Sequence, residues 1–127
     1  MRHACTVERV IDGDTVEVVI DLGFGVHCRR LVRLASIETA EMQGANRMEG
    51  QAARAGLRSL VDGSSWWVLV TVGTDRWGRV VGDLVNPRDG GHITRQMVDL
   101  GFAWWIKGQS RRAGWAMTRG PLRAPDF

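Results

Sequence analysis

The stretch VERVIDGDTVEVVI, residues 7–20, decides how the chain is expected to fold. Its second half alternates apolar and polar side chains, with Val16, Val18 and Ile20 on one face, which is the two-residue period of a half-buried strand. The Asp-Gly pair in its middle is a strong hairpin signal, because both residue types adopt the backbone angles of a tight turn. The stretch therefore predicts two antiparallel strands joined by an acidic turn.

The segments that follow extend this hairpin into a small barrel. A third strand is expected after two glycines, with Val26, Cys28, Val32 and Leu34 on its apolar face. Helical spacing of apolar residues begins at Met48 and ends at an Asp-Gly pair.

Further strands are predicted over residues 65–72 and 79–85, and a second short helix over residues 93–100. Five strands with a helix between the third and the fourth is the order of an OB-fold. The predicted fold class is therefore α+β, mainly β: a five-stranded OB-fold barrel with two to three short helices.

The 127 residues are enough for one domain, which we expect over residues 1–107. Residues 108–127 form a short tail that is broken by glycine and proline and supports at most one short helix, packed on the domain or on a partner. No apolar run approaches the roughly 18 residues of a membrane span. The N-terminus lacks the apolar segment of a secretory signal, which favours a cytoplasmic protein, although secretion of a processed form stays open.

The composition gives a weak hint of an anionic partner. The net charge is +3, and the cations are 16 Arg against a single Lys. Codon bias and phosphate recognition by the guanidinium fork both explain that excess. Cys5 and Cys28 are expected to be buried free thiols, and the three scattered histidines are expected to face solvent rather than to bind a metal.

A set of charged residues remains after this strand and helix patterning. Singly, each has an ordinary explanation as a turn former, a helix cap or a solvated charge. Together they supply what phosphodiester hydrolysis requires, namely oxygen ligands for a hard cation, a carboxylate base for water, and cations around the transition state. The set consists of Asp14, Glu38, Glu41, Arg33 and Arg79.

Four segments make this chemistry more specific. They are VERVIDGDTVEV (7–18), VRLASIETAE (32–41), TDRWGR (74–79) and ITRQMVDLGFAWW (93–105). In order and spacing they resemble the motifs of the staphylococcal (micrococcal, thermonuclease-type) nuclease family over roughly residues 5–106. The resemblance implies an OB-fold nuclease domain.

The resemblance also implies a calcium site. The carboxylates of Asp14 and Glu38 and the backbone carbonyl of Thr39 would hold one Ca²⁺ ion, with other divalent cations as an alternative. Glu38 stands where the family usually has Asp, and Ala40 where it usually has Pro. The longer side chain alters the reach of the ligand, and the loss of proline leaves the loop less preorganised.

By the same resemblance, Arg33, Glu41 and Arg79 would be catalytic. Glu41 would orient or deprotonate the attacking water, and the two arginines would clamp the scissile phosphate. Arg76 and Trp77 would contact the substrate, with simple loop packing as the alternative for the indole. Tyrosines that shape the family's nucleotide pocket have no counterpart, because the chain contains no Tyr.

The implied function is a calcium-dependent endonuclease that hydrolyses DNA and/or RNA with little sequence specificity and leaves 3′-phosphates. The alternative is a catalytically weak or inactive OB-fold module that binds nucleic acid or protein. No membrane partner is expected. A monomer is expected in which Trp104, Trp105 and Trp115 cover the core, with a homodimer through this C-terminal region as the other possibility.

Overall fold

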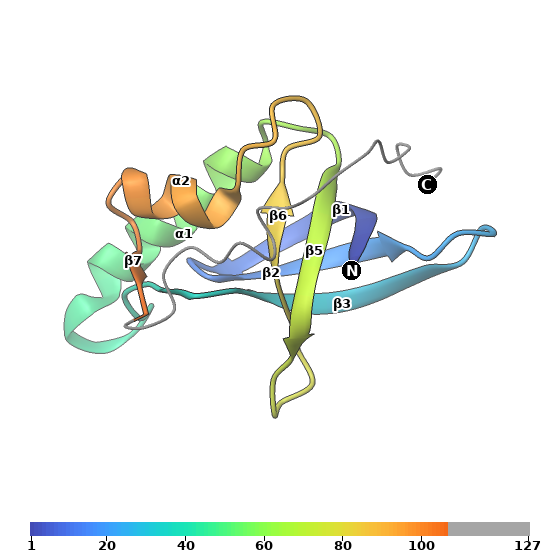
Figure 1. The fold of residues 1–127 in the computed structure, drawn as a ribbon. Coiled ribbons are helices and arrows are strands. Elements are labelled where there is room, and N and C mark those ends of the chain that lie inside the picture. Colours follow the sequence, from blue (N-terminus) through green and yellow to red (C-terminus); the bar gives the residue numbers. More distant parts are fainter. Residues whose placement is uncertain (107–127) are drawn as a thin grey trace.

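A closed five-stranded barrel forms the body of the computed structural model, which describes residues 1–106 (Figure 1). The strand order is β1-β2-β3-β6-β5, with β3 and β6 parallel and every other pair antiparallel. The barrel strands are β1 (Arg2–Asp12), β2 (Thr15–Asp21), β3 (His27–Leu34), β5 (Trp67–Thr74) and β6 (Val80–Val85).

Two helices and a small second sheet cover one end of the barrel. The helices are α1 (Arg47–Val61), preceded by a 3₁₀ turn at Gly44–Asn46, and α2 (Ile93–Asp99). A second sheet pairs two strands of two residues each, β4 (Ile37–Glu38) and β7 (Trp104–Trp105). The five-stranded barrel and the two helices confirm the predicted fold class.

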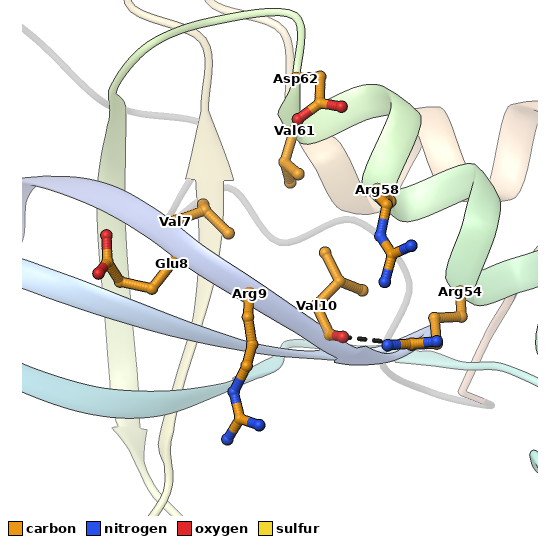
Figure 2. Close-up of a pocket in the computed structure, with 8 residues that line it drawn as sticks. All are labelled: Val7, Glu8, Arg9, Val10, Arg54, Arg58, Val61 and Asp62. Atoms are coloured by element: carbon orange, nitrogen blue, oxygen red, sulfur yellow. Dashed lines mark hydrogen bonds between the residues drawn. The ribbon is translucent and has the colours of Figure 1, made fainter.

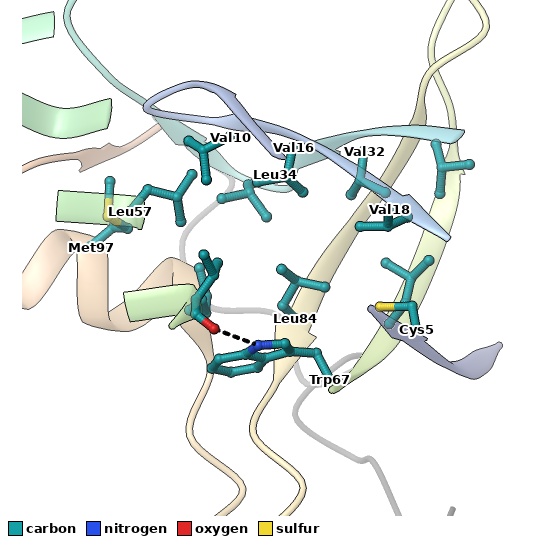
Figure 3. Packing of buried hydrophobic residues seen from close by; sticks show 14 of the residues in the cluster. Cys5, Val10, Val16, Val18, Val32, Leu34, Leu57, Trp67, Leu84 and Met97 are labelled. Atoms are coloured by element: carbon teal, nitrogen blue, oxygen red, sulfur yellow. Dashed lines mark hydrogen bonds between the residues drawn. The ribbon is translucent and has the colours of Figure 1, made fainter. Parts of the chain in front are cut away.

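The core lies where the inward faces of the barrel meet the two helices (Figure 3). Val16, Val18 and Ile20 are buried there, as their alternation predicts. Trp67 closes the core from β5, and its indole N–H donates a hydrogen bond of 3.1 Å to the carbonyl of Val61, the last residue of α1. Burial of the indole is therefore compatible with its polar atom.

Helix α1 also contacts the outside of β1. The Nε of Arg54 donates to the carbonyl oxygen of Val10 at 3.2 Å, and Figure 2 shows the Arg54 and Arg58 side chains reaching from the helix toward this strand. The contact fixes α1 beside the end of β1 that leads into the acidic turn.

The third strand differs from its prediction. Val26 lies before it, in the turn, and is 52% exposed, while Cys28 is only half-buried. The strand is amphipathic only in its second half, where Val32 and Leu34 are buried. The preceding turn is sharp, because Phe24 between two glycines has a left-handed φ of 57°.

Two further expectations need correction. β5 begins two residues later than predicted, and only its first half is buried on both faces, because Val68 and Val70 pack in a second apolar cluster outside the barrel while Val72 is exposed. His3 and His92 are half-buried rather than solvent-facing, and the Nδ1 of His92 lies 3.0 Å from the buried carboxylate of Asp83.

Both cysteines are free thiols, and Cys5 is fully buried. Within residues 1–106 no helix is long and apolar enough to span a membrane. The expected tail, including Trp115 and the short helix, lies outside the described residues.

Candidate functional site

Arg33 is the centre of the candidate site. It lies in β3 opposite Thr15 of β2, on the strand face that points away from buried Val32 and Leu34. Its Nη2 contacts the Glu38 carboxylate at 2.8 Å, the Asp14 carboxylate at 3.5 Å and the Ile37 carbonyl at 2.8 Å. The guanidinium is therefore held by two carboxylates and the backbone at the end of the barrel.

Asp14 reaches this arginine from the tip of the β1–β2 hairpin. Its backbone N–H donates to the Asp12 carboxylate at 3.1 Å, and the Thr15 hydroxyl donates to the Asp14 carboxylate at 3.2 Å. Burial and a hydrogen bond with Asp12 outweigh the attraction of Arg33 and raise the pKa of Asp14 to about 7. The hairpin tip thus places a desolvated carboxyl group beside a cation.

Close backbone packing positions the tip and the loop that follows β4. A Cβ on Gly13 would lie 2.8 Å from the Thr39 hydroxyl and 2.8 Å from the Ala53 Cβ, so only glycine lets the tip fit between the loop and α1. A Cβ on Gly50 would lie 2.1 Å from the Glu41 carbonyl oxygen. Glycine in α1 therefore allows the Glu41 backbone to rest directly on the helix.

Glu41 itself is exposed. Within residues 1–106 its carboxylate makes no hydrogen bond or ion pair, in contrast to Asp14 and Glu38. An exposed carboxylate on a fixed backbone is available to a water molecule or a substrate.

The remaining predicted residues lie in the β5–β6 turn, which Asp75 organises. The Asp75 carboxylate accepts hydrogen bonds from the backbone N–H groups of Trp77 at 3.0 Å and Arg79 at 2.9 Å, and from the Arg79 Nε at 2.6 Å. Desolvation opposes the charged form, but these donors outweigh it and lower the pKa of Asp75. The Arg76 guanidinium stacks 4.5 Å from the centre of the Trp77 ring.

The parallel pairing of β3 with β6 relates this turn to Arg33. Arg33 lies opposite Val81 of β6, and Arg79 directly precedes this strand, two residues before Val81. A hydrogen bond of 3.3 Å from Arg30 to the Gly78 carbonyl also joins the turn to β3. The structure thus brings Asp14, Arg33 and Glu38 into contact, whereas Arg79 lies directly before β6 and is engaged by Asp75.

Comparison with known proteins identifies the family of the chain. Residues 30–116 match the family described as staphylococcal nuclease homologue. The chain belongs to the staphylococcal nuclease family. Two curated relatives, from Escherichia coli and Escherichia coli O157:H7, are each named "Uncharacterized endonuclease" and are 36% identical over 99 residues. The match covers 77% of this chain, and the chain spans 58% of the length of these relatives.

Members of this nuclease family typically depend on a metal ion, and the donor set here fits one. The Asp14 and Glu38 carboxylates converge on one nitrogen of Arg33, and hard cations prefer such oxygen ligands. No group of three His, Cys, Asp or Glu side chains suited to a metal occurs in residues 1–106. A site here would therefore combine two carboxylates with a backbone carbonyl, for which Thr39 is the candidate.

Some residues of the site were not singled out from the sequence. Asp12 contacts Asp14, and Asp75 orients Arg79, yet either carboxylate looks like an ordinary turn former in the sequence. The repeated Asp spacing in the D-G-D tip was the available signal for Asp12. Nothing in the local sequence signals Gly50, because its role depends on a loop nine residues earlier.

Proposed function

We propose that this chain is a metal-dependent nuclease that hydrolyses phosphodiester bonds of DNA and/or RNA with little sequence specificity. The observation that carries the proposal is the contact of Asp14, Arg33 and Glu38 at one barrel end, with an exposed Glu41 on the adjoining loop that has no partner among residues 1–106. The endonuclease names of the relatives support the same reaction class.

The residues of the chain would have two roles in the reaction: some would bind the phosphate, and one would accept a proton. Arg33 and Arg79 would hold the non-bridging oxygens of the scissile phosphate, because a guanidinium is always charged and donates two parallel hydrogen bonds. Glu41 would take a proton from the attacking water. As the water oxygen bonds to phosphorus, the P–O5′ bond breaks, which leaves a 3′-phosphate and a 5′-oxygen that is protonated from solvent.

Asp14, Glu38 and the Thr39 carbonyl are proposed to hold the metal, with one Ca²⁺ ion as the proposed cofactor. When bound, the ion would supply positive charge next to the phosphate. Calcium tolerates the longer Glu38 side chain better than magnesium, because its ligand shell is larger and less rigid. Arg76 and Trp77 are proposed to contact the substrate from the β5–β6 turn.

The test is cleavage of plasmid and single-stranded DNA by the purified chain with calcium, with magnesium and with chelator. An arginine that acts on a phosphoryl transition state is worth about 10³-fold or more. Arg79→Ala and Glu41→Gln should therefore be severely impaired, whereas Arg58→Ala, an exposed arginine of α1, should match the wild type. Equal activity in all three variants would indicate a contaminating nuclease.

The second candidate is a catalytically weak or inactive module of the same fold that binds nucleic acid or protein. It is favoured by the engaged state of Arg33 and Arg79, both of which are held by carboxylates of the chain. If the wild type and every variant are inert with each metal, this candidate replaces the nuclease. A cytoplasmic location and the 1–107 domain boundary stay predictions.

A further inference from the structure

A pocket of about 510 Å³ lies between the start of α1 and the segment that leads from α2 to β7. Its lining includes Ala40, Asn46, Glu49, Phe102 and Trp104. None of the residues assigned above to the metal or to the phosphate lines it. The pocket nevertheless adjoins that site, because Ala40 stands between Thr39 and Glu41, and Trp104 pairs with Glu38.

The two polar side chains of the pocket, Asn46 and Glu49, lie at the start of α1 but do not cap the helix. Asn46 is the N-cap of α1, and Glu49 follows three residues later, a spacing that normally yields a reciprocal capping box. Asn46 makes no side-chain cap hydrogen bond, and the Glu49 carboxylate has no hydrogen bond or ion pair within residues 1–106. Both groups therefore remain available to an occupant of the pocket.

The rest of the lining is aromatic and small. Trp104 is 53% exposed, although it follows a buried alanine, and Phe102 packs against the core beside it. A half-exposed indole next to a small-residue wall offers a flat apolar surface. Stacking on such a surface, together with a carboxylate and an amide at the rim, matches a heteroaromatic ring that carries amino groups.

Charge decides which part of a nucleic acid would enter. Among residues 1–106 the lining contains Glu49 and no Lys or Arg, so these residues repel a phosphate, whereas an amino group of a base donates to a carboxylate. The neighbouring site differs because it contains Arg33, whose guanidinium donates the hydrogen bonds that a phosphate accepts. The two surfaces together suit a strand whose phosphate lies at Arg33 and whose adjoining base turns toward Trp104.

We propose that this pocket receives one unpaired nucleobase next to the scissile phosphate, stacked on Trp104 with its amino edge toward Glu49 and Asn46. The proposal rests on the proposed nuclease function for the position of the phosphate. A base that is paired and stacked in a duplex is not available to a pocket. The enzyme should therefore cleave single strands in preference to duplexes.

The experiment uses single-stranded oligonucleotides that differ by one abasic residue near the cleaved bond. In the wild type, one abasic position should raise KM by about 5- to 150-fold, the equivalent of about 1–3 kcal/mol of stacking. Trp104→Ala should raise KM for the intact strand and abolish this sensitivity, and Trp104→Phe should restore part of it. Phe24→Ala removes a fully exposed aromatic ring at the β2–β3 turn and should change neither quantity.

Glu49→Gln provides an independent readout. It should reduce the preference for amino-bearing bases, so that strands with and without an amino group at the sensitive position have closer KM values. Equal KM for intact and abasic strands at every position would overturn the proposal. A dimer in sedimentation that Trp104→Ala converts to monomer would also overturn it, because the pocket would then hold a second copy of the chain.

Failure of the nuclease function is distinguishable from failure of the pocket. If no strand is cleaved with any metal, binding of the same labelled strands to the full chain is measured by fluorescence anisotropy in chelator. Binding that weakens at one abasic position in the wild type but not in Trp104→Ala would support the base pocket without catalysis. Binding indifferent to both changes would overturn the pocket.

Discussion

Gly50→Ala is expected to separate catalysis from stability. The added methyl carbon would lie 2.1 Å from the Glu41 carbonyl oxygen and 2.5 Å from its carbon, whereas ordinary contact begins at 3.4 Å. Both neighbours are backbone atoms, so no flexible side chain can yield. The loop that carries Glu41 must therefore move away from α1 by about an ångström or more, because packed interiors do not absorb such an overlap.

The two consequences are measured separately, one as stability and the other as rate. Overpacking costs about 1–3 kcal/mol, and the better helix propensity of alanine returns about 0.8–1 kcal/mol, so the net loss of stability stays at about 2 kcal/mol or less. Displacement of a catalytic group by about 1 Å costs on the order of 100-fold in rate. We expect kcat to fall about 100-fold while the urea midpoint moves only modestly.

The assay measures kcat on a fluorogenic single-stranded oligonucleotide with calcium, and unfolding in urea. Val61→Ala is the matched control, because this buried residue lies at the other end of α1 and its truncation lowers stability without touching the loop. Its kcat should equal that of the wild type well below the unfolding temperature. Full activity in Gly50→Ala, or an equal loss in Val61→Ala, would refute the positioning of Glu41 by this glycine.

Three further outcomes are expected. The pKa of Asp14 is raised to about 7 in the folded chain, so ionisation of this group disfavours folding when no metal is bound. In chelator, the free energy of unfolding of the wild type should therefore fall relative to that of Asp14→Asn as pH rises from about 4 to 7. Burial raises the pKa of Cys5 to about 12, so a disulfide reagent at pH 8 should label only Cys28 in the native chain and both thiols after unfolding. Labelling of Cys5 in the native Cys28→Ser variant would contradict this expectation. Asp75→Ala should lower kcat toward that of Arg79→Ala, because it removes the carboxylate that orients Arg79, and it should lower the melting temperature as well, because two backbone N–H groups of the turn lose their acceptor; unchanged kcat would show that the ion pair has no role in activity.

Much of the barrel could be predicted because local pattern and tertiary burial agree. Alternation in β2 and the apolar spacing of α1 each match the buried faces that the structure shows. Elements without a period could not be found in this way. β4 and β7 are two residues long, and they exist because Glu38 and Trp104, far apart in sequence, are brought together by the packing of α2.

Some residues of the candidate site could likewise be predicted from the sequence, and others could not. Resemblance to the family selected Asp14, Arg33 and Glu38, and the structure brings these three into contact, while their catalytic and metal-binding roles stay predictions. The contribution of Gly50 was not predictable, because a glycine inside a helix reads only as a weak helix former. Glycine is needed there because the helix contacts the Glu41 backbone, and a single sequence does not show such contacts.

Arg33 and Arg79 differ from an ordinary surface arginine because carboxylates of the chain hold them in place. An excess of arginine is therefore not by itself a sign of a phosphate site. Arg33 is fixed by Asp14 and Glu38, and Arg79 by Asp75, so both guanidiniums are oriented before a substrate arrives. A preorganised cation avoids the reorganisation cost that a mobile side chain incurs at the transition state. The same carboxylates lower the net positive charge of the site, and a bound cation would offset that loss. Orientation by acidic neighbours and the proposed dependence on a metal would therefore be two consequences of one arrangement.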